Sequence, residues 1–255
     1  MPEASVELLQ FEFSHFNEKA RWALDWKGVP HSRTSYLPGP HAPSIKRLTG
    51  ETTVPVVRFG DQIVSGSARI IDELERRVPE PALYPTDAEE RSRALEIQRR
   101  FDDTVGPLVR RGLFAALLQT PGYLCWLFAR ERSLAKRALY RASFPIAQGM
   151  MRRSMGISDQ ASIDEAYRGV EAGLDFVARE AGESEGQLVG DTFTVADLAA
   201  AALLGAAVMP ADSPMVLPGP RPAQHTAWLE RWTDHPGAAW VRAQFRKHRR
   251  APQAG

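Results

Sequence analysis

The chain has 255 residues, 44% of them hydrophobic and 25% charged, with a formal net charge of +1. This length is enough to bury two cores, so we expect two domains. The balanced charge provides no overall field that would attract nucleic acid. The single cysteine, Cys125, excludes an internal disulfide and a cysteine-based zinc site, and we expect it in the core. Because no basic, apolar leader begins the sequence, we expect a cytoplasmic protein.

Strands and helices alternate in the first part of the sequence. We expect a strand over residues 6–13, a helix over 14–28, a second strand over 34–37 and a short helix over 44–48. In the first helix, Phe16, Ala20 and Leu24 recur at i, i+4 and i+8. This spacing predicts an apolar stripe that faces a core.

Residues 52–67 carry the most distinctive pattern of this part. A β-rich run, a Gly-Asp turn and a second short run predict a hairpin over residues 54–64, and Ser67 is placed to be the N-cap of the next helix. Pro55 cannot donate to a strand ladder, so it belongs at a strand start, at an edge or in a cis bond. A cis Val54–Pro55 bond would turn the backbone N–H and C=O of Val54 outward, toward an extended peptide ligand.

Three prolines between positions 78 and 85 predict a linker after this helix. Beyond it, every long segment has helical periodicity. We expect helices over 88–118 and 163–181, with a second long helix between them that is kinked at Pro145. Residues 112–129 lack charge, but a Pro-Gly pair divides them. We interpret them as two buried helix ends rather than as a membrane span.

The sharpest helix signal is the string Gly-Asp-Thr-Phe-Thr-Val-Ala-Asp-Leu at residues 190–198. Thr194 as the N-cap and Asp197 at the third helical position form a capping box, and Phe193 with Leu198 forms its hydrophobic staple. The alanine-rich helix that follows carries no charge after Asp197. We expect it to be the buried centre of a helical bundle.

Basic residues gather in two segments of this half. Between 130 and 153 there are seven Lys or Arg against one acid. This pattern predicts either a solvated helix face or a surface that attracts anionic substrates or a partner. Residues 246–250 end a single last helix that carries Trp228 and Trp240, and we expect them to form a frayed, solvated tail.

Two of these patterns resemble the cytosolic glutathione transferase superfamily. One is Val54-Pro55 followed by a hairpin and Gly66-Ser67; the other is the Gly-x-x-x-Thr-x-Ala-Asp string, which resembles the capping box of that family's helical domain. The resemblance implies an α/β thioredoxin-like domain of order βαβαββα over residues 1–80, a linker over 81–87 and an all-helical C-terminal domain over 88–255. It also implies a homodimer with the helix at 88–118 in its centre.

The resemblance places a glutathione site on the first domain. Val54, before the cis-proline Pro55, would pair with the cysteinyl backbone of glutathione. Ser67 would hold the γ-glutamyl carboxylate at the start of its helix. The family usually has an acidic residue where this chain has Gly66. The backbone contact of Gly66 survives that change, but an acidic partner for the γ-glutamyl ammonium must come from elsewhere.

The run Ser-His-Phe-Asn-Glu-Lys-Ala-Arg at 14–21 is similar to the Cys-Pro-Phe-x-Glu/Gln-Arg pattern of omega-type transferases, with Ser14 in place of the redox cysteine. In a bacterial-type member of this kind, the Ser14 hydroxyl would donate a hydrogen bond to the glutathione sulfur and favour its thiolate. From the residues alone, Ser14 is simply an N-cap. Asn17 is the alternative donor. Because a serine cannot form a mixed disulfide, cysteine-type thiol transfer is excluded at this position.

The resemblance implies a detoxifying glutathione transferase that conjugates its co-substrate to an apolar electrophile, without a metal. The expected substrate pocket contains His15, Phe16, Phe114 and Trp126. A glutathione-dependent isomerase or dehalogenase is an alternative, because a fold does not decide the reaction. A non-catalytic binding module is another, since Gly66 and His15 depart from the family pattern.

Overall fold

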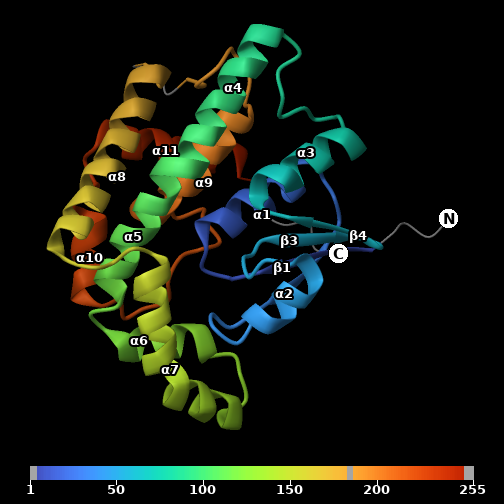
Figure 1. The fold of residues 1–255 in the computed structure, drawn as a ribbon. Helices are drawn as coiled ribbons and strands as arrows, with labels where there is room; N and C mark the ends of the chain where they lie inside the picture. The colour runs from blue at the N-terminus through green and yellow to red at the C-terminus, as the bar shows by residue number, and fades with distance from the viewer. Residues whose placement is uncertain (1–4, 183–185, 250–255) are drawn as a thin grey trace.

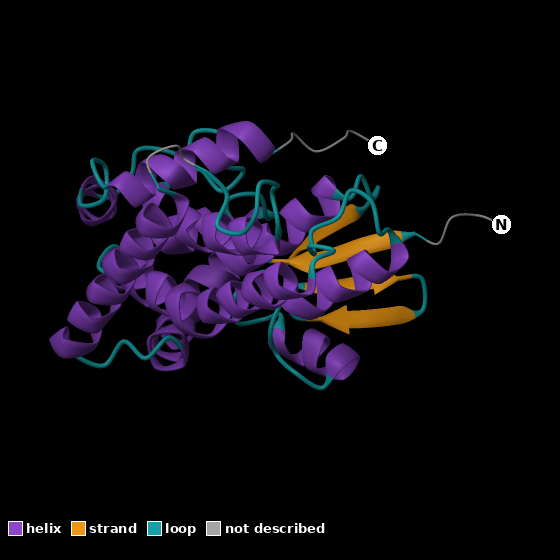
Figure 2. Cartoon of the chain, turned by 90° about the horizontal axis from the view of Figure 1, so that it is seen from above, coloured by secondary structure: helices purple, strands orange, loops and turns teal. Residues whose placement is uncertain are grey.

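The computed structural model describes residues 5–182 and 186–249. A small sheet with its covering helices forms one part, and helices alone form the other (Figure 1). Figure 2 shows the strands gathered at one end of the molecule and the helical part at the other. The fold is thus the expected thioredoxin-like part joined to an all-helical part.

The sheet has four strands in the order β2-β1-β3-β4. They are β1 Val6–Gln10, β2 Ser32–Ser35, β3 Val56–Phe59 and β4 Gln62–Ser65; the helices are α1 His15–Trp26, α2 Ala42–Thr49 and α3 Ser67–Arg77. β2 is parallel to β1, whereas β3 is antiparallel to β1 and β4. The order βαβαββα is as predicted. The second strand lies two residues earlier than predicted, because Ser32 pairs with Glu7 at the start of the β1 ladder.

Both faces of the sheet are covered, because successive strand residues point to opposite sides. Leu8 and Val57 belong to the main core, with α1 and α3. Leu9 and Val56 form a smaller cluster with Ile45 of α2 on the other face. All five side chains are at most 2% exposed. This two-sided packing fixes the sheet, and with it the loops at the ends of its strands.

The helical part is built around α9 (Val195–Val208). Every residue from 195 to 204 is fully buried, since α1, α4, α5, α8 and α11 all pack on this helix. The other helices are α4 Ala88–Arg100, α5 Gly106–Leu117, α6 Pro121–Ala129, α7 Leu134–Ser154, α8 Gln160–Ala181, α10 Ala223–Glu230 and α11 Pro236–His248. Over the described ranges no single helix is long and apolar enough to cross a membrane; Ala88–Leu117 and Pro121–Ala129 reach that threshold only together, bent by 112°.

The predicted capping box at the start of α9 is confirmed. The Thr194 Oγ1 accepts a hydrogen bond from the Ala196 N–H at 3.2 Å, and the Asp197 carboxylate accepts one from the Thr194 N–H at 2.8 Å. The same carboxylate accepts the Leu188 N–H at 2.7 Å. Burial raises the pKa of Asp197 to about 6, although these hydrogen bonds oppose the rise.

The helix predicted over 88–118 is continuous but not regular. Between α4 and α5 it contains a π-helical turn, η1 (Phe101–Val105). A π turn inserts extra chain into the helix and rotates the residues after it about the axis. It therefore sets which side chains of α5 face the sheet part.

Other helix boundaries differ from the prediction. The long helix expected after residue 121 is two helices, with a break at residues 130–133, and Pro145 lies inside the second of them. The last helix is also two, because Pro236 starts α11 and the His235 ring, as its N-cap, accepts the Gly237 N–H. Cys125 is a buried core residue, as predicted.

The predicted tail is solvated at Arg246 and Lys247, which are exposed, but the prediction that it is frayed is wrong. Helix α11 continues to His248, and Arg249 is only 8% exposed because it forms ion pairs with Glu18 and Asp25 of α1. Position 250 lies outside the described residues. The end of the helical part is therefore joined to the first helix of the sheet part.

Candidate active site

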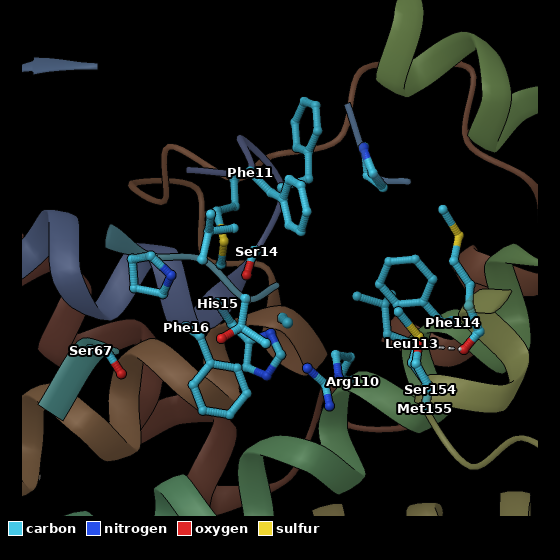
Figure 3. A pocket seen from close by; sticks show the side chains of 18 of the residues that line it. Phe11, Ser14, His15, Phe16, Ser67, Arg110, Leu113, Phe114, Ser154 and Met155 are labelled. Carbon is cyan, nitrogen blue, oxygen red and sulfur yellow. Dashed lines mark hydrogen bonds between the residues drawn. The ribbon is translucent and has the colours of Figure 1, made fainter. Parts of the chain in front are cut away.

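A cavity of about 680 Å³ lies between the sheet part and the helical part (Figure 3). One wall comes from the sheet part and is lined by Ser14, Thr52, Thr53, Val54, Pro55, Gly66, Ser67 and Arg69. The facing wall comes from the helical part and is mostly apolar, with Leu113, Phe114, Leu117, Leu124, Leu127, Phe128, Met151 and Leu217. The volume lies in the range of roughly 300–1,000 Å³ found for small-molecule sites.

The segment before β3 lies on the polar wall of the cavity, and the Val54–Pro55 bond is cis. The carbonyl of Pro55 accepts a hydrogen bond from the Gly66 N–H at 2.9 Å, which ties the segment to the start of α3. The backbone N–H and C=O of Val54 form no hydrogen bond within the described part of the chain.

Ser67 lines the cavity but is not the N-cap of α3. Gly66 is the N-cap, with a φ of +91°, and Ser67 is the first helical residue. Glycine adopts this positive φ without a steric penalty. Because Gly66 has no side chain, no side-chain oxygen caps the first turn of α3. The helix N-terminus therefore presents uncapped N–H donors beside the buried Ser67 hydroxyl, a combination suited to an anion.

Ser14 lies where the chain turns from the first strand into α1. It is the N-cap of α1 by position, with extended dihedral angles, but its hydroxyl makes no capping hydrogen bond. Figure 3 shows the hydroxyl close to His15 and at the edge of the open space. The side chain is thus available to a ligand rather than bound to its own helix.

His15 lines the cavity and joins α1 to the helical part. Its Nε2 lies 2.9 Å from the carbonyl of Gly106, at the start of α5, and a carbonyl can only accept, so Nε2 carries the proton. Burial lowers the pKa of His15 to about 3; the hydrogen bond to the Gly106 carbonyl opposes this fall, and the positive charge of Arg110 adds a smaller part of it. His15 is therefore neutral at physiological pH, and its hydrogen bond to Gly106 holds the start of α1 against the start of α5.

Two residues predicted for the site lie outside it. Asn17 is fully buried and does not line the cavity; its Oδ1 accepts the Phe11 N–H at 3.3 Å, so it braces the strand-to-helix corner instead. Trp126 is 38% exposed and packs against Tyr123, because its position on α6 turns it away from the cavity. Phe16 and Phe114 line the cavity.

The helix α4–η1–α5 adds charged residues that the sequence analysis did not select. Asp102 lies in the π turn and binds the buried Lys19 of α1, with Nζ–O distances of 2.8 and 2.6 Å. Its neighbour Asp103 also lines the cavity, as does Arg110. The sequence pattern could have identified Arg110, because it precedes Phe114 by four residues and Leu113 by three, the spacing of one helix face.

No metal site is evident in the part of the chain that the structure describes. Within these ranges no group of three or more His, Cys, Asp or Glu could hold a metal ion.

Three comparisons with known proteins bear on this site. Residues 8–82 match the family model of the glutathione S-transferase N-terminal domain. A maleylpyruvate isomerase from Ralstonia sp. is 30% identical over 120 residues, which are 46% of this chain and 57% of that protein. The chain thus spans little more than half the length of this curated relative.

Solved structures resemble almost the whole chain. A glutathione S-transferase from Rhodospirillum rubrum F11 has a TM-score of 0.61 at 23% identity, over 92% of this chain and 86% of that one. A maleylpyruvate isomerase described as a zeta-class bacterial glutathione S-transferase has a TM-score of 0.58 at 22% identity, over 98% of both chains. A transferase from Methylobacterium radiotolerans, in complex with glutathione sulfonate, has a TM-score of 0.57 at 21% identity, over 98% and 97%. Residues 8–82 therefore match the glutathione transferase N-terminal domain, and the chain as a whole has the glutathione transferase fold.

Proposed function

We propose that this protein binds glutathione in the cavity and transfers its thiolate to an electrophilic carbon of an apolar substrate. The observation that carries the proposal is the pairing of two unlike walls: backbone and hydroxyl donors on the sheet part face an apolar surface on the helical part. A peptide co-substrate suits the first wall, and an apolar electrophile suits the second. The reaction would take place where they meet, beside Ser14.

Glutathione would lie along Val54, Gly66 and Ser67. The free N–H and C=O of Val54 would pair with the cysteinyl backbone, and the N-terminus of α3 with Ser67 would hold the γ-glutamyl carboxylate. Asp103 is the candidate partner for the γ-glutamyl ammonium. It lines the cavity and forms no ion pair within the described ranges, whereas the adjacent Asp102 is held by Lys19.

The Ser14 hydroxyl would donate a hydrogen bond to the glutathione sulfur. A hydrogen bond to the charged form of a thiol lowers its pKa from the ordinary value of about 8.5 and so raises the thiolate fraction at neutral pH. Asn17 is not placed to share this role, because it is buried outside the cavity.

A glutathione-dependent isomerase is the second candidate, favoured by the match to the Ralstonia maleylpyruvate isomerase. In that reaction the thiolate would add to a double bond and later leave, so that glutathione is regenerated. The two remaining alternatives, a dehalogenase and a binding module without turnover, are supported only by the fold.

Calorimetric titration of the wild-type protein with glutathione, followed by turnover with an activated chloroarene and with a cis-configured unsaturated acid, separates these functions. Conjugation consumes one glutathione for each product formed, whereas isomerisation consumes none. We expect binding and stoichiometric consumption. Binding without turnover of either substrate would support the binding module, and no binding would contradict the proposal.

A further inference from the structure

Arg110 is a half-buried cation of the cavity for which the proposed chemistry has no use; Arg99, which also lines the cavity, is exposed to water. It rises from α5 into the space between the His15 and Phe16 side and the Leu113 and Phe114 side (Figure 3). The side chain is half-buried, and its Nε is enclosed without any hydrogen-bond partner. The guanidinium carbon lies 5.7 Å from the ring centre of Phe16, a weak cation–π contact.

No carboxylate neutralises Arg110. Within residues 5–182 and 186–249, no hydrogen bond or ion pair to its guanidinium is present. Burial lowers the pKa of Arg110, and no acidic group counteracts that effect. The histidine beside it is neutral. Its charge is therefore partly removed from water and left without compensation, an arrangement that costs free energy.

Among residues 5–182 and 186–249, the fully buried lysine and arginine side chains are paired with acids. Lys19 binds Asp102, Lys27 binds Glu75 and Arg21 binds Glu18. Arg69, which also lines the cavity, donates to the Ser65 carbonyl at 2.6 Å. In the described part of the chain, Arg110 is thus partly removed from water without the acidic partner that the fully buried cations have, and its guanidinium points into the cavity (Figure 3).

We propose that Arg110 binds a carboxylate of the second substrate, so that the electrophile is an organic acid with an apolar body rather than a neutral hydrophobic molecule. This inference rests on the proposed function. The planar guanidinium offers a pair of parallel N–H donors that match a carboxylate. Leu113, Phe114 and Leu117 continue the same face of α5 and would hold the apolar body.

This arrangement would also orient the reaction. A carboxylate held at Arg110 fixes one end of the electrophile next to His15, and so near the Ser14 hydroxyl where the sulfur would lie. Holding a substrate by an ion pair at one end and by packing along its length restricts it to few poses.

The test compares an acid with its ester. The substrates are 4-chloro-3-nitrobenzoate and its methyl ester, and the quantity measured is the ratio of kcat/KM for acid over ester, in the wild type and in Arg110→Gln. We expect the ratio to fall about 10- to 150-fold in the variant, because the acid loses a hydrogen-bonded charge partner that the ester never had. Arg100→Gln is the matched control, since it removes one positive charge from an exposed arginine at the end of α4 that lies outside the cavity.

Binding provides a readout that does not need turnover. Benzoate should bind the wild-type protein saturated with glutathione about 10- to 150-fold more tightly than it binds Arg110→Gln, by calorimetry, whereas benzamide should not distinguish the two. The melting temperature of the unliganded variant should not fall, because an uncompensated charge is removed; a lower value would assign Arg110 a structural role.

Each failure has a distinct signature. If the wild type does not bind glutathione, the proposed function fails. If glutathione binds but the acid-to-ester ratio and benzoate affinity are the same in Arg110→Gln, only the present inference fails. If Arg110→Gln instead loses glutathione affinity, Arg110 belongs to the peptide site and the inference is likewise overturned.

Discussion

Ser14 and Ser67 each lie at the start of a helix, but neither hydroxyl forms a capping hydrogen bond to its helix. For Ser14 we expect a catalytic effect. If its hydroxyl stabilises the glutathione thiolate, Ser14→Ala raises the thiol pKa, so the rate falls at neutral pH and recovers as the pH rises. One lost donor to a charged acceptor corresponds to about 1.5–3 kcal/mol, roughly a 10- to 150-fold loss in kcat and kcat/KM. The pH profile of kcat/KM measures this shift.

Two companion variants sharpen the test of Ser14. Asn17→Ala should lower stability without moving the pH profile, because the side chain is buried outside the cavity. Ser14→Cys should react with glutathione disulfide, releasing one glutathione and retaining the other as a mixed disulfide that intact-protein mass spectrometry detects. A profile that is unshifted in Ser14→Ala but shifted in Asn17→Ala would reverse the two roles.

For Ser67 we expect a binding effect alone. Removing a hydroxyl that bonds the γ-glutamyl carboxylate should weaken glutathione binding by about 1.5–3 kcal/mol. Because Gly66 rather than Ser67 is the N-cap, Ser67→Ala should leave the free energy of unfolding nearly unchanged. Calorimetry and denaturant unfolding check the two parts. Ser65→Ala, two residues away and outside the cavity lining, is the control. Equal affinity in wild type and Ser67→Ala would remove Ser67 from the site.

Residues carried by a contiguous motif could be predicted from the sequence, whereas those that depend on helix orientation could not. Val54, Pro55 and Ser67 follow from one short string whose hairpin sets their geometry locally. Trp126, which was expected in the pocket, does not line the cavity, and Arg110, which does, was not selected, because the sequence does not fix which face of α5 or α6 meets the sheet part. A π turn precedes α5 and changes which of its side chains face the sheet part, and no residue pattern in the sequence predicted that turn.

Among the elements, α9 offers the clearest test of local sequence signals, because its capping box was predicted and is present. Thr194→Ala should destabilise the protein by about 0.5–2 kcal/mol, and Asp197→Ala by a similar amount or more, since Asp197 also accepts the Leu188 N–H. The double variant should lose less than the sum, because both residues serve one box. Denaturant unfolding of the three variants decides this, and strict additivity would contradict a shared box.

Asp197 also predicts a pH dependence of stability. Its folded-state pKa is raised to about 6, above the ordinary value of 3.8, so between these pH values the folded state binds more protons than the unfolded state. The contribution of Asp197 to the free energy of unfolding is therefore fully present below about pH 4, and it is lost as the pH rises to about 6. Asp197→Asn cannot titrate, so the wild type should lose a few kcal/mol relative to it over this range. Parallel stability curves across pH 4–6 would contradict the raised pKa.

Element types could be predicted, but several boundaries could not. Strands, helices and their order follow from periodicity and turn residues. The breaks at residues 130–133 and at Pro236 were missed because helical spacing continues across them, and only proline at the first helical position marked the second. The ion pairs of Arg249 join positions more than two hundred residues apart, which no local pattern reveals.

At the scale of the whole molecule, the proposed site depends on contacts between the two parts. His15 binds the Gly106 carbonyl, Lys19 binds Asp102, and Arg249 binds Glu18 and Asp25, so α1 is held by the helical part along its length. Ser14 stands at the start of that helix. The position of the proposed thiolate donor relative to the apolar wall is therefore fixed by these buried polar contacts.

The last prediction concerns assembly. The glutathione transferase fold and the sequence resemblance lead us to expect a homodimer, with the helix at 88–118 in its centre. Light scattering at micromolar concentration should then give about twice the chain mass of 28.3 kDa. The exposed apolar side chains of α7, among them Leu139 and Ile146 at 72% and 71% exposure, offer a rival interface. Leu139→Glu should therefore leave the mass unchanged, whereas Ser92→Glu, at an exposed position of α4 outside the cavity lining, should lower it. A mass near one chain in the wild type would contradict the dimer, and the opposite response of the two variants would move its interface to α7.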